Sequence, residues 1–130
     1  QASFVVDTME YLHKGGRCSS LARFAASVLK IKPTIQVKDG GMEVGKKYMG
    51  SFDKIIGKYV EATLQTFDKP DLTRIFVTHT SAKPETVQLV KDKIKELADF
   101  KEIKETIASS TITSHCGRGT LGILYINDAE

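Results

Sequence analysis

The chain has 130 residues, of which 41% are apolar and 27% are charged, a composition typical of one folded domain and unlike that of a disordered chain. Its net charge of +3 comes from 19 basic and 16 acidic side chains that alternate along the sequence, which argues against a nucleic-acid-binding surface. No apolar run approaches the roughly 20 residues that span a bilayer. The two cysteines are far apart and lack metal-ligand spacing, so we expect no metal site or disulfide scaffold and favour a reducing cytoplasm.

The first part of the chain predicts one strand followed by two helices. Residues 3–6 form an apolar strand, and Asp7 with Glu10 three positions later resembles a capping box that opens a short helix. A second helix is expected over 19–29, where apolar residues recur at the spacing of one helical face. Pro33 should end this helix, because the residue before a proline avoids the α region.

A hairpin and a strong helix are predicted next. Strands at 34–38 and 42–49 flank Asp39-Gly40-Gly41, a combination that favours a tight hairpin turn. Ser51 stands at the expected N-cap of the following helix. This helix has a clear apolar stripe over 52–64, which predicts that one face is buried in the core.

The second half predicts a βαβ unit and a last strand. A turn is expected at 69–71, a buried apolar strand at 74–80, and a helix at 84–98 that has a proline in its first turn. Strands follow at 102–108 and 121–126. The order predicts an α/β fold of two layers, in which a mixed sheet of about six strands, with a right-handed crossover, carries helices mainly on one face.

The run Ser114-His115-Cys116-Gly117-Arg118-Gly119 brings reactive side chains together with glycines. A cysteine nucleophile needs a base within hydrogen-bond reach, but His115 and Cys116 would point to opposite sides of an extended segment. A Walker-type phosphate loop is also disfavoured, because a strand and not a helix follows. From the residues alone, a bystander cysteine in a plain turn is favoured over a small anion-binding turn.

Two further features allow a functional and a structural interpretation. Gly15-Gly16-Arg17 could aim a guanidinium group at a carboxylate or phosphate, or could be a helix C-cap followed by a solvated arginine. His79, at the end of a predicted strand, is interpreted as structural. In both cases the structural interpretation is favoured by the residues alone.

Three segments resemble the C-terminal half of the DegV family. They are "FVVDTMEYLHKGGR" at 4–17, "LKIKPTIQVKDGGMEV" at 29–44 and "TSHCGRGTLG" at 113–122. The resemblance implies a protein of two domains with a fatty acid bound between them. It also implies that bacterial members serve as the lipid-binding subunit of a fatty-acid kinase. Residues 1–130 would then be a fragment that comprises the C-terminal domain, without the N-terminal α/β domain.

The resemblance also implies roles for single residues. By the motif match, His115 and Arg17 would bind the carboxylate head group of the fatty acid. Five neighbours in the two motifs would lie close to the ligand: Gly16, Ser114, Gly117, Arg118 and Gly119. No catalytic residue, metal or cofactor is expected. The sequence departs from the family pattern at Cys18, Cys116, Arg118 and Ser114, and a solvated Arg118 is the default interpretation.

Three functions therefore remain open. The leading hypothesis is a cytoplasmic, non-enzymatic carrier whose partners are a long-chain fatty acid, the catalytic subunit of the kinase and, transiently, a membrane surface. An acyl hydrolase that uses Cys116 and His115 is the first alternative. A protein-interaction domain without a lipid role is the second.

Overall fold

The computed structural model describes residues 1–6, 31–109 and 119–128. Six strands and two helices lie in these ranges, in the order β1 (Ala2–Val5), β2 (Ile31–Lys38), β3 (Gly41–Met49), α3 (Phe52–Thr66), β4 (Pro70–His79), α4 (Pro84–Leu97), β5 (Glu102–Ile107) and β6 (Leu121–Asn127). The helices predicted after residue 7 and at 19–29 lie outside the described residues.

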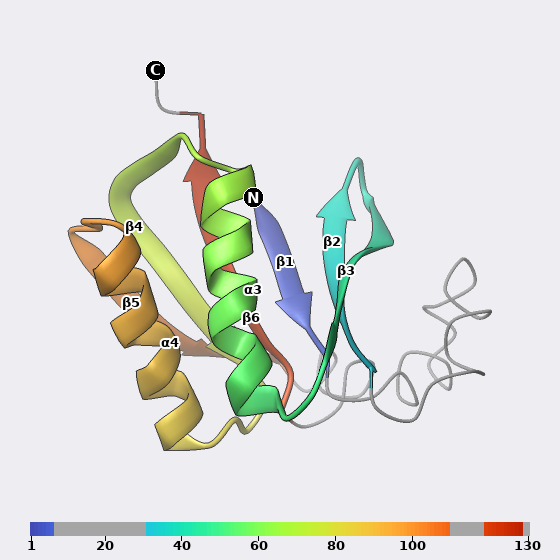
Figure 1. Cartoon of the computed structure of the whole chain (residues 1–130). Helices are drawn as coiled ribbons and strands as arrows, with labels where there is room; N and C mark the ends of the chain where they lie inside the picture. Colours follow the sequence, from blue (N-terminus) through green and yellow to red (C-terminus); the bar gives the residue numbers. More distant parts are fainter. Residues whose placement is uncertain (7–30, 110–118, 129–130) are drawn as a thin grey trace.

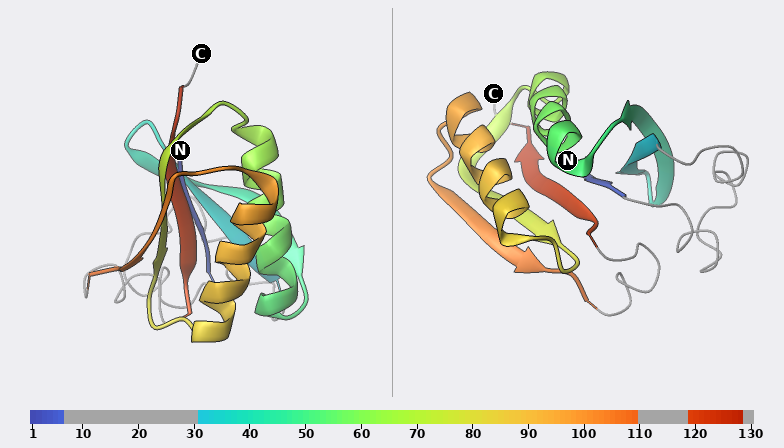
Figure 2. Two further views of the ribbon diagram at one scale, coloured as in Figure 1. Left: turned by 90° about the vertical axis from the view of Figure 1, so that its left-hand side faces the viewer. Right: turned by 60° about the horizontal axis from the view of Figure 1, so that its bottom comes forward.

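The strands form one mixed sheet in the order β3-β2-β1-β6-β4-β5 (Figure 1). β4 and β5 are parallel and are connected by α4, whereas all other neighbouring strands are antiparallel. The helices α3 and α4 lie side by side on one face of the sheet (Figure 2). This arrangement confirms the predicted two-layer α/β fold with a six-stranded mixed sheet.

The predicted hairpin is confirmed, and its turn explains the choice of residues. Asp39 and Gly40 have φ of 52° and 76°, and positive φ at both central positions is the requirement of a type I′ turn. The first strand begins at Ile31, however, so the prediction that it starts at residue 34 was wrong. Pro33 lies inside β2, where the register is irregular between Pro33 and Ile35, and an irregular position tolerates a residue without an N–H group.

A second proline also belongs to a strand and not to the predicted turn at 69–71. β4 begins at Pro70, which pairs with Asn127 of β6, and the register shifts between Pro70 and Ile75. The Asn127 side chain accepts a hydrogen bond from the main-chain N–H of Lys69 at 2.9 Å. Pro70 is tolerated because the first residue of a strand does not need to donate to the ladder.

The two helix starts are where the sequence predicts them. Ser51 is the N-cap of α3, but its side chain makes no capping hydrogen bond, and its carbonyl oxygen accepts from the main-chain N–H of Ile55 at 3.1 Å. α4 begins at Pro84, in the first turn where a proline costs no hydrogen bond. The Ser51 side chain therefore does not act as the hydrogen-bonding cap that its position suggests.

The core lies between the two helices and the sheet. The strands contribute Val5, Ile75, Val77, Leu121, Ile123 and Tyr125, which point to the helical face. The helices contribute Ile55, Ile56, Tyr59, Val60, Val87, Val90 and Ile94. These helical residues recur every three or four positions, so the predicted stripes are the faces that are buried.

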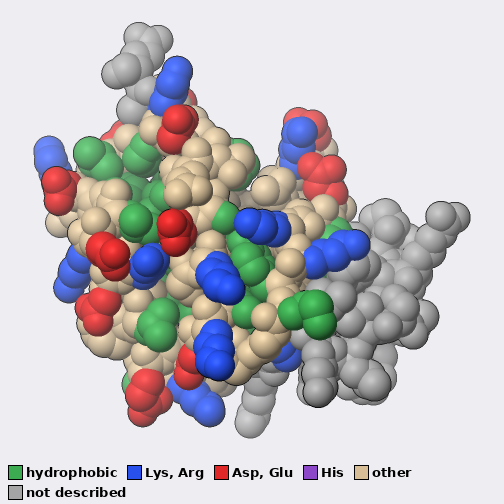
Figure 3. Space-filling model, viewed as in Figure 1, with side chains coloured by type: hydrophobic (Ala, Val, Ile, Leu, Met, Phe, Trp, Pro, Cys, Tyr) green, Lys and Arg blue, Asp and Glu red, His purple; other side chains and the backbone are tan. Residues whose placement is uncertain are grey.

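Lys and Arg side chains lie among Asp and Glu side chains on the surface of the helical layer (Figure 3). Lys93 of α4 lies 3.8 Å from Glu96 on the same helix and 3.9 Å from Glu61 on α3. Such exposed pairs contribute little to stability, but they divide the surface charge between both signs. The mixed surface agrees with the expectation from the alternating charges in the sequence.

Candidate functional site

Several strands end or begin side by side at one end of the sheet. Val5, near the end of β1, pairs with Thr34 of β2 and with Leu121, the first residue of β6. Leu121 also pairs with His79, the last residue of β4, and His79 pairs with Ile107, the last residue of β5. Residues 7–30 connect β1 to β2 and residues 110–118 lie between β5 and β6. Both segments therefore leave the sheet and return to it at this same end.

Most of the predicted head-group residues lie outside the described residues. Gly16 and Arg17 fall in 7–30, and Ser114, His115, Cys116, Gly117 and Arg118 fall in 110–118. Their proposed roles thus remain predictions. What the fold adds is that both segments are attached to the same end of the sheet, as a shared site would require.

Gly119 is the one predicted ligand-proximal residue that is described. It has φ of +83°, a backbone conformation that glycine adopts without strain. Its N–H donates a hydrogen bond to the carbonyl oxygen of Thr80 at 2.7 Å. Gly119 therefore has the left-handed backbone conformation that a glycine turn before β6 would need.

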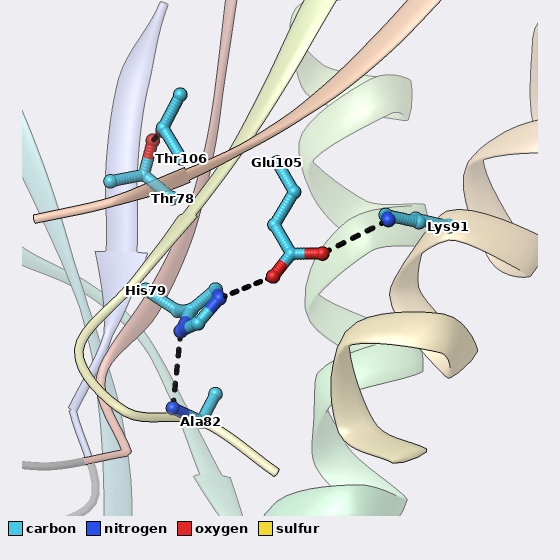
Figure 4. A network of polar contacts seen from close by, with 6 residues as sticks. All are labelled: Thr78, His79, Ala82, Lys91, Glu105 and Thr106. Atoms are coloured by element: carbon cyan, nitrogen blue, oxygen red, sulfur yellow. Dashed lines mark hydrogen bonds and ion pairs between the residues drawn. The ribbon is translucent and has the colours of Figure 1, made fainter. Parts of the chain in front are cut away.

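His79 is the centre of a polar network at the same end of the sheet (Figure 4). Its Nε2 lies 2.9 Å from Oε2 of Glu105, and its Nδ1 accepts a hydrogen bond from the main-chain N–H of Ala82 at 3.1 Å. Because Nδ1 accepts, Nε2 carries the proton and donates to Glu105. The other carboxylate oxygen of Glu105 accepts from Nζ of Lys91 at 3.0 Å. The network thus connects β4, β5 and α4.

The network lowers the pKa of the Glu105 carboxyl group. The hydrogen bond from His79 is the largest cause, followed by the hydrogen bond from Lys91. Glu105 stays on the rim, with 41% of its side chain exposed, whereas the His79 side chain is buried. Both ring nitrogens of His79 are engaged within the protein, so neither is available to activate a nucleophile. The structural interpretation of His79 is confirmed.

A hollow of about 360 Å³ lies beside this network, where both helices begin. Ser81, Lys83 and Gly119 contribute to its lining, as do Asp53 of α3 and Thr86 of α4. Thr86 Oγ1 donates a hydrogen bond to Oδ1 of Asp53 at 2.5 Å. Since the carboxylate offsets the nearby lysine, the hollow shows no clear preference for an anion.

The sheet face opposite the described helices carries a second group of apolar side chains. Phe4, Phe76 and Leu124 point to this face and are half-buried, and Ile126 is 61% exposed. A groove of about 430 Å³ is lined by Phe76, Leu124, Tyr125 and Ile126, and also by the polar side chains of Gln1, Asp71, Thr73 and Arg74. The sequence predicts a buried apolar strand at 74–80. Ile75 and Val77 of this strand face the helices, and Phe76 faces the opposite side. This pattern is the sequence signal for the apolar surface, but the sequence analysis did not connect it with a ligand.

The described residues contain no group of three or more histidine, cysteine, aspartate or glutamate side chains that could hold a metal ion. Within the same ranges, neither helix has the length and apolar character needed to cross a membrane. The end of the sheet near His79 therefore offers hydrogen-bonding and charged groups. The sheet face opposite the helices offers apolar contacts.

A protein-family model described as "Uncharacterised protein, DegV family" matches residues 1–128. The chain belongs to the DegV family. A DegV domain-containing protein of Clostridium perfringens is 31% identical over 133 residues, an alignment that covers 98% of this chain and 43% of that protein. A DegV relative from Thermotoga maritima that is named fatty acid-binding protein is 28% identical over 122 residues, covering 94% of this chain and 42% of that protein.

Solved DegV structures have the same fold. The crystal structure of the fatty acid kinase (Fak) B3 protein of Streptococcus pneumoniae, loaded with linoleic acid, superposes with a TM-score of 0.81 at 22% identity. The match covers 98% of this chain and 44% of that one. The chain thus spans less than half the length of the DegV relatives that it matches, and the resemblance seen in the sequence motifs is confirmed.

Proposed function

We propose that this chain is the C-terminal domain of a fatty-acid carrier that presents the acyl carboxylate to a separate kinase subunit, which forms the acyl phosphate. The observation that carries the proposal is the half-buried apolar surface of Phe4, Phe76 and Leu124 opposite the helices. The proposal is supported by DegV relatives that are named or described as binding fatty acids. The protein would act in the cytoplasm and would have no catalytic residue of its own.

The apolar surface has a suitable position for part of an acyl chain. From Gly122 to Ile126 the strand extends about 13 Å, at roughly 3.3 Å per residue. Each methylene buried there would contribute about 0.8 kcal/mol, so most of the binding free energy would come from the acyl chain. Gly122 lies at the end of the sheet where residues 7–30 and 110–118 are attached, which would place the carboxylate at that end.

The head group would be bound by His115 and Arg17. A carboxylate removed from water needs hydrogen-bond donors and, preferably, a cation, and these two side chains supply both. Gly16, Ser114, Gly117, Arg118 and Gly119 would lie close to it. The rest of the longer protein would supply the other wall of the binding site, so we expect residues 1–130 alone to bind fatty acids weakly.

The test is mass spectrometry of organic extracts from the full-length protein, combined with titration of added oleate. A co-purified fatty acid or uptake of oleate is expected. If neither is found, the carrier proposal is wrong and the interaction domain without a lipid role is favoured. Micromolar or tighter binding by residues 1–130 alone would contradict the proposal that a second wall is required.

The matched variants His115→Ala and Cys116→Ala separate the carrier from the hydrolase. In a reconstituted kinase assay, His115→Ala should reduce acyl-phosphate formation at least tenfold, and Cys116→Ala should leave it nearly unchanged. Equal tolerance of both substitutions would contradict the head-group role of His115. An acyl-ester hydrolysis activity that disappears in Cys116→Ala would favour the hydrolase instead.

A further inference from the structure

His79 and Thr80, at the end of β4, form hydrogen bonds with the residues on both sides of 110–118. On the incoming side, the carbonyl oxygen of His79 accepts a hydrogen bond from the N–H of Ala108 at 2.9 Å. On the outgoing side, the carbonyl oxygen of Thr80 accepts from the N–H of Gly119 at 2.7 Å. The N–H of Thr80 also donates to the carbonyl oxygen of Thr120 at 2.9 Å. Two consecutive residues thus fix where this segment leaves and re-enters the sheet.

The side chain of Thr80 adds a further bond on the outgoing side. Its Oγ1 accepts a hydrogen bond from the N–H of Thr120 at 3.2 Å, and both threonines are buried. Thr80 therefore contacts Thr120 through its main chain and its side chain. Removal of the hydroxyl group alone would leave a buried N–H of Thr120 without this partner.

The side chain of His79 keeps Thr80 in place. His79 is only 6% exposed, and its hydrogen bonds to Glu105 and from Ala82 hold the strand end and the turn that follows Thr80 (Figure 4). Ser81, inside this turn, has φ of +55°, so the turn contains a strained residue that its surroundings must hold. His79 supports this turn through its hydrogen bonds with Glu105 of β5 and with Ala82, the residue after Ser81.

We propose that His79 and Thr80 are positioning residues for head-group binding, because together they fix both ends of the segment that carries His115. The inference rests on the proposed function. Binding groups must be held within a fraction of an ångström, and residues that never touch the ligand often supply that constraint. Neither residue is proposed to contact the fatty acid.

The experiment uses the full-length protein loaded with oleate that carries ¹³C at its carboxyl carbon. In Thr80→Val, the carboxyl resonance should shift and the Kd for oleate should rise about tenfold. Thr80→Ser, which keeps the hydroxyl group, should restore both values. Thr63→Val is the matched control, since it removes the 2.7 Å hydrogen bond from Oγ1 of a buried threonine on α3 to the carbonyl oxygen of Tyr59, on the helical side of the sheet.

The expected control result is an unchanged carboxyl resonance and an unchanged Kd in Thr63→Val. An unchanged resonance and Kd in Thr80→Val, or equal changes in Thr63→Val, would overturn the positioning role while the carrier proposal stands. If the unsubstituted protein takes up no oleate, the carrier proposal is overturned, and the positioning role is overturned with it.

Discussion

The hydroxyl group of Tyr59, on α3, donates a hydrogen bond to the main-chain oxygen of Ser3 on β1 at 3.0 Å. The same hydroxyl accepts from the main-chain N–H of Ile123 on β6 at 3.0 Å and lies 2.8 Å from Oγ of Ser3. Ser3 and Ile123 are register partners in the sheet. A helix side chain thus satisfies backbone groups of two paired strands, inside a core where an unpaired group would be costly.

Tyr59→Phe should destabilise the protein by roughly 1–3 kcal/mol, because it leaves buried backbone groups of Ser3 and Ile123 without their partner. The free energy of unfolding in urea is the measurement. Tyr48→Phe is the control, since the Tyr48 hydroxyl makes only a 3.4 Å contact with the carbonyl oxygen of Lys58. A loss in Tyr59→Phe no larger than in Tyr48→Phe would show that the bridge between β1 and β6 is unimportant.

The same tyrosine predicts a loss of stability at alkaline pH. Burial raises the pKa of Tyr59 from its ordinary value of 10.0 to about 12. Between these values the unfolded chain releases the phenolic proton and the folded chain keeps it, so stability is fully present below pH 10 and falls as pH rises toward 12. The contribution of this residue is about 3 kcal/mol.

Urea unfolding of the wild type and of Tyr59→Phe at pH 8, 10 and 11 measures the onset of this loss, which should reach about 1.4 kcal/mol at pH 11. The wild type should lose stability with rising pH more steeply than the variant, because phenylalanine has no proton to release. Tyr125 and Tyr48, whose pKa values are also raised by burial, are present in both proteins, so the difference between the two pH dependences reports Tyr59 together with its charge interactions with them. Parallel pH dependences would contradict the assignment to Tyr59.

Gly122→Ala should destabilise the protein by about 1–3 kcal/mol, the usual cost of overpacking. A Cβ atom at Gly122 would overlap the main-chain oxygen of Ser3 and lie 2.9 Å from Cβ of Phe4. Gly57→Ala is the matched control, because nothing lies within 4 Å of its Cβ position in α3, and alanine favours a helix by about 1 kcal/mol. Thermal melts should therefore move in opposite directions, and equal shifts would refute the close approach of β1 and β6.

Leu124→Trp tests the apolar surface as the acyl-chain site. A larger ring in the groove beside Phe76 and Ile126 should raise the Kd for oleate at least tenfold, because the ring occupies space intended for methylenes. Leu89→Trp, on the exposed side of α4, is the control and should leave binding unchanged. Isothermal titration of the full-length protein measures both. Unchanged binding in Leu124→Trp would exclude this groove as the acyl-chain site.

Local patterns predicted the hairpin at Asp39-Gly40 and the start of α4 at Pro84, because turn and cap preferences depend on neighbours in sequence. They failed at Pro33, which was expected to precede the strand, and at Pro70, which was expected in a turn. Both lie in strands next to register irregularities, which depend on the partner strand and not on the local sequence. The head-group residues His115 and Arg17 came from family motifs and still await an experiment.

By itself, the sequence determined the fold class, the order of the described elements and which faces of α3 and α4 are buried, since these follow from periodicity and turn chemistry within short segments. Only the tertiary structure decided that β1 lies between β2 and β6 and that His79 meets Glu105 across β4 and β5. Only the tertiary structure decided that Tyr59 reaches Ser3. Such contacts join residues far apart in the chain, and their free energy depends on the packing of the whole sheet, which no local pattern encodes.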